Sequence, residues 1–111
     1  MKAIRIAQTG GPEVMKLVDV DLGKPGPGQV RVRHTAIGLN YIDTYHRSGL
    51  YPVPLPSGLG LEAAGVVEEL GEGVTALKAG DRIAYGAGPI GAYSEMSNLP
   101  ANRLTKLTAA I

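Results

Sequence analysis

Residues 30–37 read Val-Arg-Val-Arg-His-Thr-Ala-Ile and alternate apolar with polar side chains over a full strand length. Successive side chains of a strand point to opposite faces, so this pattern predicts a strand with one buried face. The chain on either side continues in short apolar runs of the same two-residue period. Sixteen glycines and eight prolines lie between these runs in a chain of 111 residues, which indicates many tight turns. The sequence therefore predicts a mainly β domain, either a small barrel or a sandwich.

The other predicted elements are also short. Asn40 is expected to cap a helix at residues 41–47, which Ser48 and Gly49 end. Residues 50–60 are rich in proline, which has no backbone N–H to donate to a sheet, so we expect an extended loop there. Further strands, the first two paired as a hairpin, are expected at residues 3–7, 15–20, 62–70, 83–85, 92–99 and 103–107.

The composition argues against several classes of function. The formal net charge is +1 with both signs scattered, unlike a nucleic-acid-binding surface or a polybasic membrane anchor. The chain has no cysteine, and therefore no disulfide and no thiolate metal ligand. It has neither an apolar run of about 20 residues nor a signal peptide, so we expect a cytoplasmic protein without membrane or nucleic-acid partners. Its length suits a single domain over residues 1–111.

One glycine motif fits a dinucleotide-binding signature but lacks its context. Residues 86–91 read Gly-Ala-Gly-Pro-Ile-Gly and match G-x-G-x-x-G. A true site needs a helix that begins within the motif, because its N-terminal N–H groups bind the pyrophosphate. Here a strand-like stretch follows, and no acidic residue stands about 20 positions further on. We therefore interpret residues 86–91 as a hairpin or corner loop.

Residues 38–52 gather many of the side chains that can carry chemistry. They hold three tyrosines, an asparagine, an aspartate, a histidine and an arginine around the predicted helix. The segment is either a solvated turn whose tyrosines are half-buried for packing or the wall of a pocket. In a pocket, flat aromatic faces would contact a planar ligand, and hydroxyl and amide groups would bind its carbonyl edge. The residue pattern alone leaves both interpretations open.

Two stretches in this segment resemble the signature of the NADPH-dependent quinone oxidoreductases: residues 38–45 (Gly-Leu-Asn-Tyr-Ile-Asp-Thr-Tyr) and 47–52 (Arg-Ser-Gly-Leu-Tyr-Pro). These enzymes are zinc-free members of the medium-chain dehydrogenase/reductase superfamily, related to zeta-crystallin. Other stretches agree in order along the chain, at residues 10–14, 56–67, 80–85 and 91–95. The resemblance implies a GroES-like, partly open β-barrel with one or two short helices. It also implies that the Rossmann nucleotide-binding domain and the returning C-terminal part of the catalytic domain lie outside this chain, which by itself would be inactive.

The resemblance also indicates where zinc-dependent relatives bind their metal. Those relatives have a cysteine at the position of Asn40 and a histidine at the position of Leu61. Neither asparagine nor leucine can replace a thiolate and an imidazole on tetrahedral zinc, so no metal is expected. Asp43 and Glu62 belong to the shared pattern. Asp43 could orient nearby donors, and Glu62 could cap the strand or pair with a base from elsewhere.

By resemblance, the full-length protein is a homodimer that transfers reducing equivalents from NADPH to a quinone or a similar electron-poor small molecule. The missing domain would bind most of NADPH, the cofactor that carries the chemistry. Without zinc, hydrogen-bond donors must stabilise the charge that develops on the acceptor oxygen. The residues implied are Asn40, Asp43 and Tyr45 as catalytic, Tyr41, Ile42, Asp43, Thr44 and Tyr45 as cofactor-binding, and Tyr51 and Asn40 as substrate-binding.

Two alternative functions stay open. The chain could belong to a zinc-independent, NADPH-dependent enoyl reductase of the same superfamily, or it could be a stand-alone GroES-like binding module. The two histidines do not decide between them. His34 lies in the alternating strand and His46 in the pocket segment, and neither has a partner at ligand or dyad spacing. Neither is expected to be catalytic.

Overall fold

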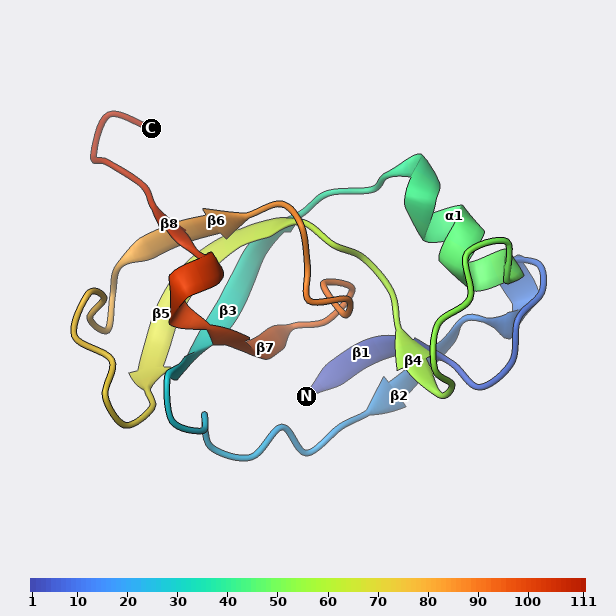
Figure 1. Ribbon diagram of the computed structural model, residues 1–111, viewed down its shortest axis with the longest axis horizontal. Coiled ribbons are helices and arrows are strands. Elements are labelled where there is room, and N and C mark those ends of the chain that lie inside the picture. The colour runs from blue at the N-terminus through green and yellow to red at the C-terminus, as the bar shows by residue number, and fades with distance from the viewer.

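The computed structural model describes all 111 residues and contains two antiparallel sheets and one α-helix. The strands are β1 (Lys2–Ile6), β2 (Lys16–Asp19), β3 (Gln29–Ile37), β4 (Ser57–Gly58), β5 (Ala63–Leu70), β6 (Arg82–Tyr85), β7 (Met96–Pro100) and β8 (Thr105–Lys106), and the helix is α1 (Tyr41–Ser48). Five strands form one sheet in the order β7-β3-β5-β6-β8, and three form the other in the order β2-β1-β4. In Figure 1 the larger sheet lies on the left, and the smaller one lies on the right below α1. The expected mainly β fold is confirmed.

The alternating pattern of residues 30–37 forms β3 at the centre of the larger sheet. β3 pairs with β5 on one side and with β7 on the other. Val30 and Val32 are fully buried, and burial of each stabilises the fold by about 2 kcal/mol. The arginines that alternate with them form ion pairs with glutamates of β5. The two valines share their core with Ala63, Val67, Leu77, Ile83, Tyr85, Ala92 and Leu99.

The smaller sheet is built on the expected hairpin. β1 and β2 pair antiparallel from Lys2 opposite Asp19 to Arg5 opposite Lys16. The third strand, β4, was not predicted, because it lies inside the proline-rich stretch expected to be loop throughout. Its two residues follow the last proline of that stretch, so their N–H groups can take part in a ladder with β1. A second, smaller core packs at this sheet and consists of Ile6, Val14 and Leu59.

The strand predicted at residues 92–99 begins later than expected, as β7 at Met96. The residues before it cross from one sheet to the other, and their backbone groups bond outside β7. The Tyr93 N–H donates to the Leu59 carbonyl, and the Tyr93 carbonyl accepts the N–H of Ile4, each at 2.8 Å. This crossing places Tyr93 in the packing around the smaller core.

The last predicted strand, residues 103–107, is also shorter than expected. It is reduced to β8, because a single 3₁₀ turn occupies Ala101–Arg103 just before it. A second 3₁₀ turn, Pro12–Val14, follows β1. The expectation of one or two short helices is met by α1 and these turns.

Helix α1 has both predicted ends. Asn40 has extended backbone angles at the N-cap (φ −128°, ψ 153°), and the helix runs one residue further than expected, to Ser48. Gly49 then adopts a left-handed conformation (φ 89°), which glycine takes without a steric penalty. No helix in the chain is long and apolar enough to cross a membrane.

Candidate active site at the N-terminus of helix α1

Asp43 is only 3% exposed, and its carboxylate holds the N-terminus of α1. Its Oδ2 accepts the backbone N–H of Asn40 at 3.1 Å, and the Asp43 N–H donates to the Asn40 carbonyl at 3.0 Å. A carboxylate that reaches back to the N-cap N–H forms half of a capping box, and its charge suits the positive end of the helix dipole. The backbone of Asn40 is therefore held directly by Asp43.

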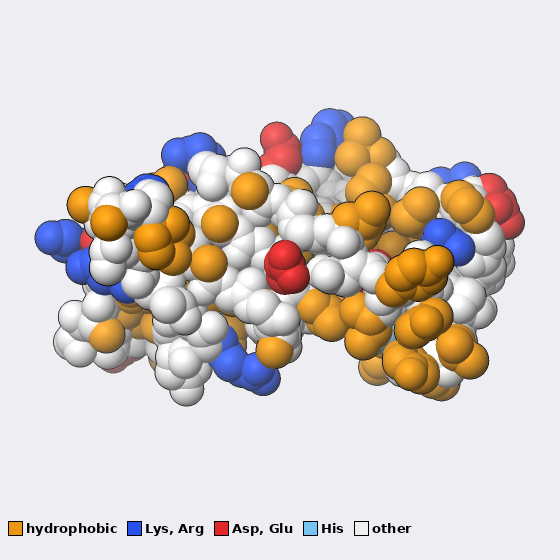
Figure 2. Space-filling view, turned by 90° about the horizontal axis from the view of Figure 1, so that it is seen from above, with side chains coloured by type: hydrophobic (Ala, Val, Ile, Leu, Met, Phe, Trp, Pro, Cys, Tyr) orange, Lys and Arg blue, Asp and Glu red, His pale blue; other side chains and the backbone are white.

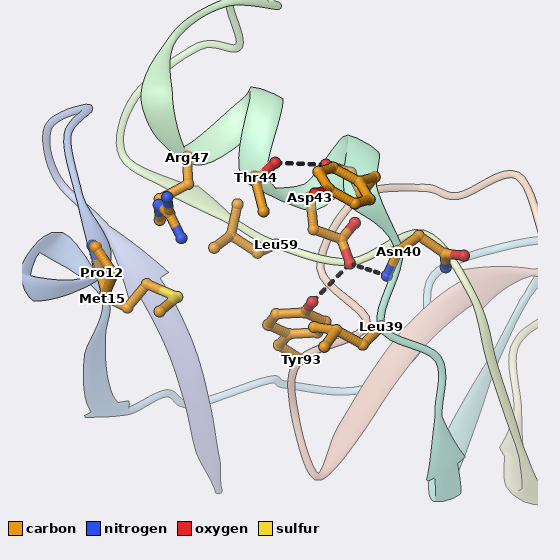
Figure 3. Close-up of a pocket in the computed structure, with 10 residues that line it drawn as sticks. Pro12, Met15, Leu39, Asn40, Asp43, Thr44, Arg47, Leu59 and Tyr93 are labelled. Atoms are coloured by element: carbon orange, nitrogen blue, oxygen red, sulfur yellow. Dashed lines mark hydrogen bonds between the residues drawn. The ribbon is translucent and has the colours of Figure 1, made fainter.

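Tyr93 makes the second hydrogen bond to the same carboxylate oxygen. Its O–H donates to Asp43 Oδ2 at 2.6 Å (Figure 3). Burial, followed by this hydrogen bond and the negative charge of Asp43, raises the pKa of the Tyr93 phenol far above its usual value. Tyr93 therefore remains a protonated donor. The other carboxylate oxygen, Asp43 Oδ1, is buried and has no hydrogen-bond partner.

The Asn40 side chain is held from a different direction. Its Nδ2 donates to Glu62 Oε2 at 3.1 Å, and Glu62 directly precedes β5. A carboxamide has two N–H donors and a carbonyl acceptor. The carbonyl oxygen of Asn40 faces the Asp43 N–H in the capping box, whereas its second N–H makes no hydrogen bond within the chain and can serve a ligand.

A cavity of about 450 Å³ lies beside these groups (Figure 3). Its apolar walls are Pro12 and Met15 from the turn after β1, Leu39 ahead of α1, and Leu59. Its polar lining comes from Asn40, Asp43, Thr44 and Arg47, and the rings of Tyr41 and Tyr93 complete it. A mostly apolar cavity with a few placed polar groups is typical of small-molecule sites.

Two of the predicted site tyrosines, Tyr45 and Tyr51, lie outside the cavity that Asn40 and Asp43 line. Their rings pack edge to face with centroids 5.2 Å apart. Tyr41 connects the two regions, since it lines the cavity and its ring centroid lies 6.3 Å from that of Tyr45. Tyr41 is 81% exposed and Tyr51 50%. Figure 2 shows hydrophobic side chains gathered at the end of the molecule that carries α1, where Leu39 and Leu50 are also exposed.

The structure thus divides the predicted site residues into two groups. Asn40, Tyr41, Asp43 and Thr44 line the cavity, whereas Ile42, Tyr45 and Tyr51 do not. Several further residues line the cavity without a predicted site role: Pro12, Met15, Leu39, Arg47, Leu59 and Tyr93. Tyr93 lies in one of the stretches that carried the family resemblance, but fifty positions separate it from Asp43. No local pattern could pair the two.

His34 is a packed and fully bonded side chain. Its Nδ1 lies 2.8 Å from the Ser94 carbonyl, which can only accept, so Nδ1 carries the proton. Nε2 then accepts the O–H of Tyr85 at 2.9 Å. Burial lowers the pKa of His34, although the bond to Ser94 acts in the opposite direction, and burial raises the pKa of Tyr85 to about 12. The neutral imidazole is the form that this geometry stabilises.

Residues 86–91 form a corner loop, as predicted from the stretch that follows the motif. No helix begins within them. Two of the N–H groups that a pyrophosphate would need are used inside the chain. The Gly88 N–H donates to the Leu61 carbonyl, and the Gly91 N–H donates to the Gly60 carbonyl, each at 2.8 Å.

The two positions at which zinc ligands were considered carry asparagine and leucine. The chain contains no group of three or more His, Cys, Asp and Glu side chains that could hold a metal ion. At the two positions where zinc-dependent relatives place ligands, Asn40 offers an amide that is bonded to Glu62, and Leu61 offers only an alkyl chain.

The family model of the alcohol dehydrogenase GroES-like domain matches residues 26–109. This chain belongs to that family. The GroES-like domain is 57% identical over 111 residues to a quinone oxidoreductase of Pseudomonas aeruginosa, covering 99% of the chain and 34% of that protein. It superimposes on the crystal structure of Escherichia coli quinone oxidoreductase complexed with NADPH with a TM-score of 0.96 and 48% identity, covering all of the chain and 34% of the other.

A relative named for a different activity is also similar to the GroES-like domain. It is a 2-haloacrylate reductase of a Burkholderia species, 49% identical over 107 residues, which are 92% of the chain and 32% of that protein. The chain thus spans about a third of the length of the relatives that it matches. These similarities confirm the GroES-like fold and the resemblance to quinone oxidoreductases inferred from residues 38–52.

Proposed function

We propose that this GroES-like domain is the substrate side of a zinc-independent oxidoreductase that uses NADPH to reduce quinones. The observation that carries the proposal is the Asn40 amide, which has a free N–H at the edge of a largely apolar cavity. It stands where zinc-dependent relatives have a metal ligand. The similarity to proteins named quinone oxidoreductases, one of them in complex with NADPH, supports the assignment. In this proposal a dinucleotide-binding domain is joined to the chain.

The residues present fit a nicotinamide and a flat acceptor. NADPH supplies a hydride when it is bound. The free N–H of Asn40 binds the oxygen of a carbonyl and stabilises negative charge that develops there. The apolar side chains of Leu39 and Leu59 line the cavity and offer a ligand apolar contact. Tyr45 and Tyr51 provide aromatic surface and hydroxyl groups for the acceptor just outside the cavity.

Asp43 has a positioning role in this proposal and does not contact the acceptor. It is almost fully buried, and its Oδ2 already accepts hydrogen bonds from Asn40 and Tyr93. Thr44 and Ile42 remain predicted cofactor contacts on the same helix. The Thr44 hydroxyl donates to the Tyr41 carbonyl at 2.6 Å, which leaves its lone pairs to accept.

The test is NADPH oxidation by the full-length protein with 1,4-benzoquinone as acceptor. We expect activity that survives treatment with a metal chelator, and we expect both Asn40→Ala and Tyr45→Phe to lower turnover while the protein stays folded. Gly86→Ala is the control, since a Cβ at this position would meet no atom within 4 Å. Unchanged kinetics for Asn40→Ala and Tyr45→Phe would remove both residues from the site.

A binding measurement tests where NADPH is held. Calorimetric titration of the 111-residue chain should show affinity weaker than micromolar, because the loop at residues 86–91 uses its N–H groups internally. Micromolar affinity would contradict this part of the proposal. The proposal also includes a homodimeric full-length protein, which sedimentation analysis would test.

Reduction of an activated carbon–carbon double bond is the second candidate. The similarity to a 2-haloacrylate reductase favours it. The same amide N–H would then stabilise charge on the carboxylate or carbonyl conjugated to the double bond. Parallel assays with 2-chloroacrylate and 1,4-benzoquinone separate the two candidates through the ratio of their kcat/KM values.

A further inference from the structure

The Asn40 carboxamide donates a hydrogen bond to Glu62, whose side chain makes no other hydrogen bond in the structure. We infer that Glu62 is a positioning residue, one that sets which end of this amide faces the ligand. The inference rests on the proposed function, because it concerns the group with which Asn40 meets cofactor or acceptor.

The chemistry of the pair decides the direction of the amide. Asn40 Nδ2 and Glu62 Oε2 are 3.1 Å apart. An ionised carboxylate only accepts hydrogen bonds, so the atom that faces it must be the NH₂ group and not the carbonyl oxygen. The bond is charge-assisted, and such bonds are stronger than those between neutral groups. The carbonyl oxygen and one N–H are consequently directed away from Glu62.

The backbone of Asn40 is already held in place, so only the rotation of its side-chain amide remains to be fixed. Asp43 holds the backbone N–H of Asn40, and that backbone begins a helix. Without Glu62, only the capping-box contact with the Asp43 N–H would favour one orientation of the amide. With Glu62 in place, it offers a donor and an acceptor in one defined arrangement. In this arrangement the amide can pair with another carboxamide, or its N–H can donate to a single carbonyl oxygen.

The space that Glu62 needs is left by a glycine. The Gly38 N–H donates to the Glu62 carbonyl at 3.1 Å, which sets the two backbones side by side. A Cβ at residue 38 would collide with the carboxylate of Glu62. Gly38→Ala should therefore push the carboxylate away from Asn40 and leave its charge unchanged. The chain thus offers two independent ways to break the same contact.

The first experiment measures kcat/KM of the full-length protein with NADPH and 1,4-benzoquinone. Glu62→Gln should lower it roughly tenfold, since a neutral amide can pair with either end of the Asn40 carboxamide. The melting temperature should not change, because Glu62 is exposed. The control is Glu68→Gln in β5, the strand that follows Glu62, which loses only a solvent-exposed ion pair with Arg33. It should leave kcat/KM unchanged, and equal losses in the two variants would overturn the inference.

A double-mutant cycle then tests whether Glu62 acts through Asn40. In the Asn40→Ala background, neither Glu62→Gln nor Gly38→Ala should lower kcat/KM further, because the group that they position is gone. Gly38→Ala alone should reproduce the loss seen with Glu62→Gln, whereas Gly86→Ala, in open space, should not. Additive losses would show that Glu62 acts in some other way and would overturn the inference.

A measurement independent of activity separates this inference from the proposed function. In full-length protein labelled with ¹⁵N-asparagine, the Asn40 NH₂ resonances are assigned by their disappearance in Asn40→Ala. They should shift in both Glu62→Gln and Gly38→Ala and stay in place in Glu68→Gln. Resonances that do not move would overturn the inference even in an active enzyme. Lack of NADPH oxidation with 1,4-benzoquinone or 2-chloroacrylate would instead contradict the proposed function.

Discussion

Tyr85 and Tyr93 each donate a phenolic hydrogen bond to a side chain, partly buried His34 and buried Asp43, but the two networks differ in how completely they are satisfied. The Tyr85 hydroxyl donates to neutral His34, whose other ring nitrogen donates to a backbone carbonyl. The Tyr93 hydroxyl donates to charged Asp43, whose second oxygen has no partner. Buried polar groups are nearly always paired, and exceptions call for an explanation. The closed network lies within the larger sheet, and the incomplete one lies where α1 meets the cavity.

This difference separates a structural pair from a positioning pair. The His34 network joins His34 of β3 and Tyr85 of β6 to Ser94, which lies just before β7 where the chain crosses between the sheets. Both ring nitrogens of His34 are used in it. The Asp43 network connects Tyr93 to Asn40, the N-cap of α1. A charged acceptor also makes stronger hydrogen bonds than a neutral one. Substitutions at the two tyrosines and their acceptors should therefore differ in a predictable order.

The largest effect is expected for Asp43→Ala. It removes a buried acceptor and leaves the Tyr93 hydroxyl and the Asn40 N–H without their partner, which should lower the free energy of unfolding by about 3 kcal/mol. Urea denaturation followed by circular dichroism measures this change. Asp19→Ala is the control, because it breaks only an exposed ion pair with Lys2. A loss below about 1 kcal/mol for Asp43→Ala would show that its bonds do not hold α1.

Tyr93→Phe should have the next largest effect. It deletes one charge-assisted hydrogen bond and keeps the ring, so we expect a loss of about 2 kcal/mol in the free energy of unfolding. In the full-length protein we also expect lower turnover with 1,4-benzoquinone, because the N-terminus of α1 loses part of its support. If Tyr93→Phe were as stable as the wild type, the hydrogen bond between Asp43 and Asn40 would by itself account for the stability that Asp43 confers.

Tyr85→Phe is the matched change in the closed network and should cost less, about 1 kcal/mol, because the lost acceptor is a neutral imidazole. Because the Tyr85 hydroxyl is bonded to His34 and to neither Asn40 nor Asp43, we expect unchanged quinone turnover. The same denaturation experiment compares it directly with Tyr93→Phe. If Tyr85→Phe destabilises the chain more than Tyr93→Phe, the contrast between the two networks is wrong.

The smallest expected effect is a pH dependence that originates at His34. Burial lowers the pKa of folded His34 below the value of 6.5 expected for the unfolded chain. As the pH falls below about 6.5, the unfolded state therefore binds the proton first, and the free energy of unfolding decreases. The decrease ends once the pH reaches the folded pKa. The measurement is the free energy of unfolding between about pH 5 and pH 8, for the chain and for His34→Phe. The variant should show a shallower slope, and identical slopes would contradict the prediction.

Local patterns predicted most of the fold. The two-residue alternation of residues 30–37 predicted β3, and the Asn40 and Gly49 signals predicted both ends of α1. These elements depend on side-chain spacing and on backbone preferences of single residues, which can be read without knowledge of neighbours in space. The error at residues 92–99 arose because their backbone groups pair with the smaller sheet, and no pattern within those residues records a partner ninety positions away.

The sequence by itself determined most of the strands, the capped helix and the absence of thiolate ligands. Only the tertiary structure decided that Asp43 binds Tyr93, that Glu62 holds the Asn40 amide, and that Tyr45 and Tyr51 lie outside the cavity. The physical reason is the range of the forces involved. Backbone preferences and side-chain periodicity act within a few residues, whereas hydrogen bonds between distant side chains form only when chain crossing brings their atoms within about 3 Å.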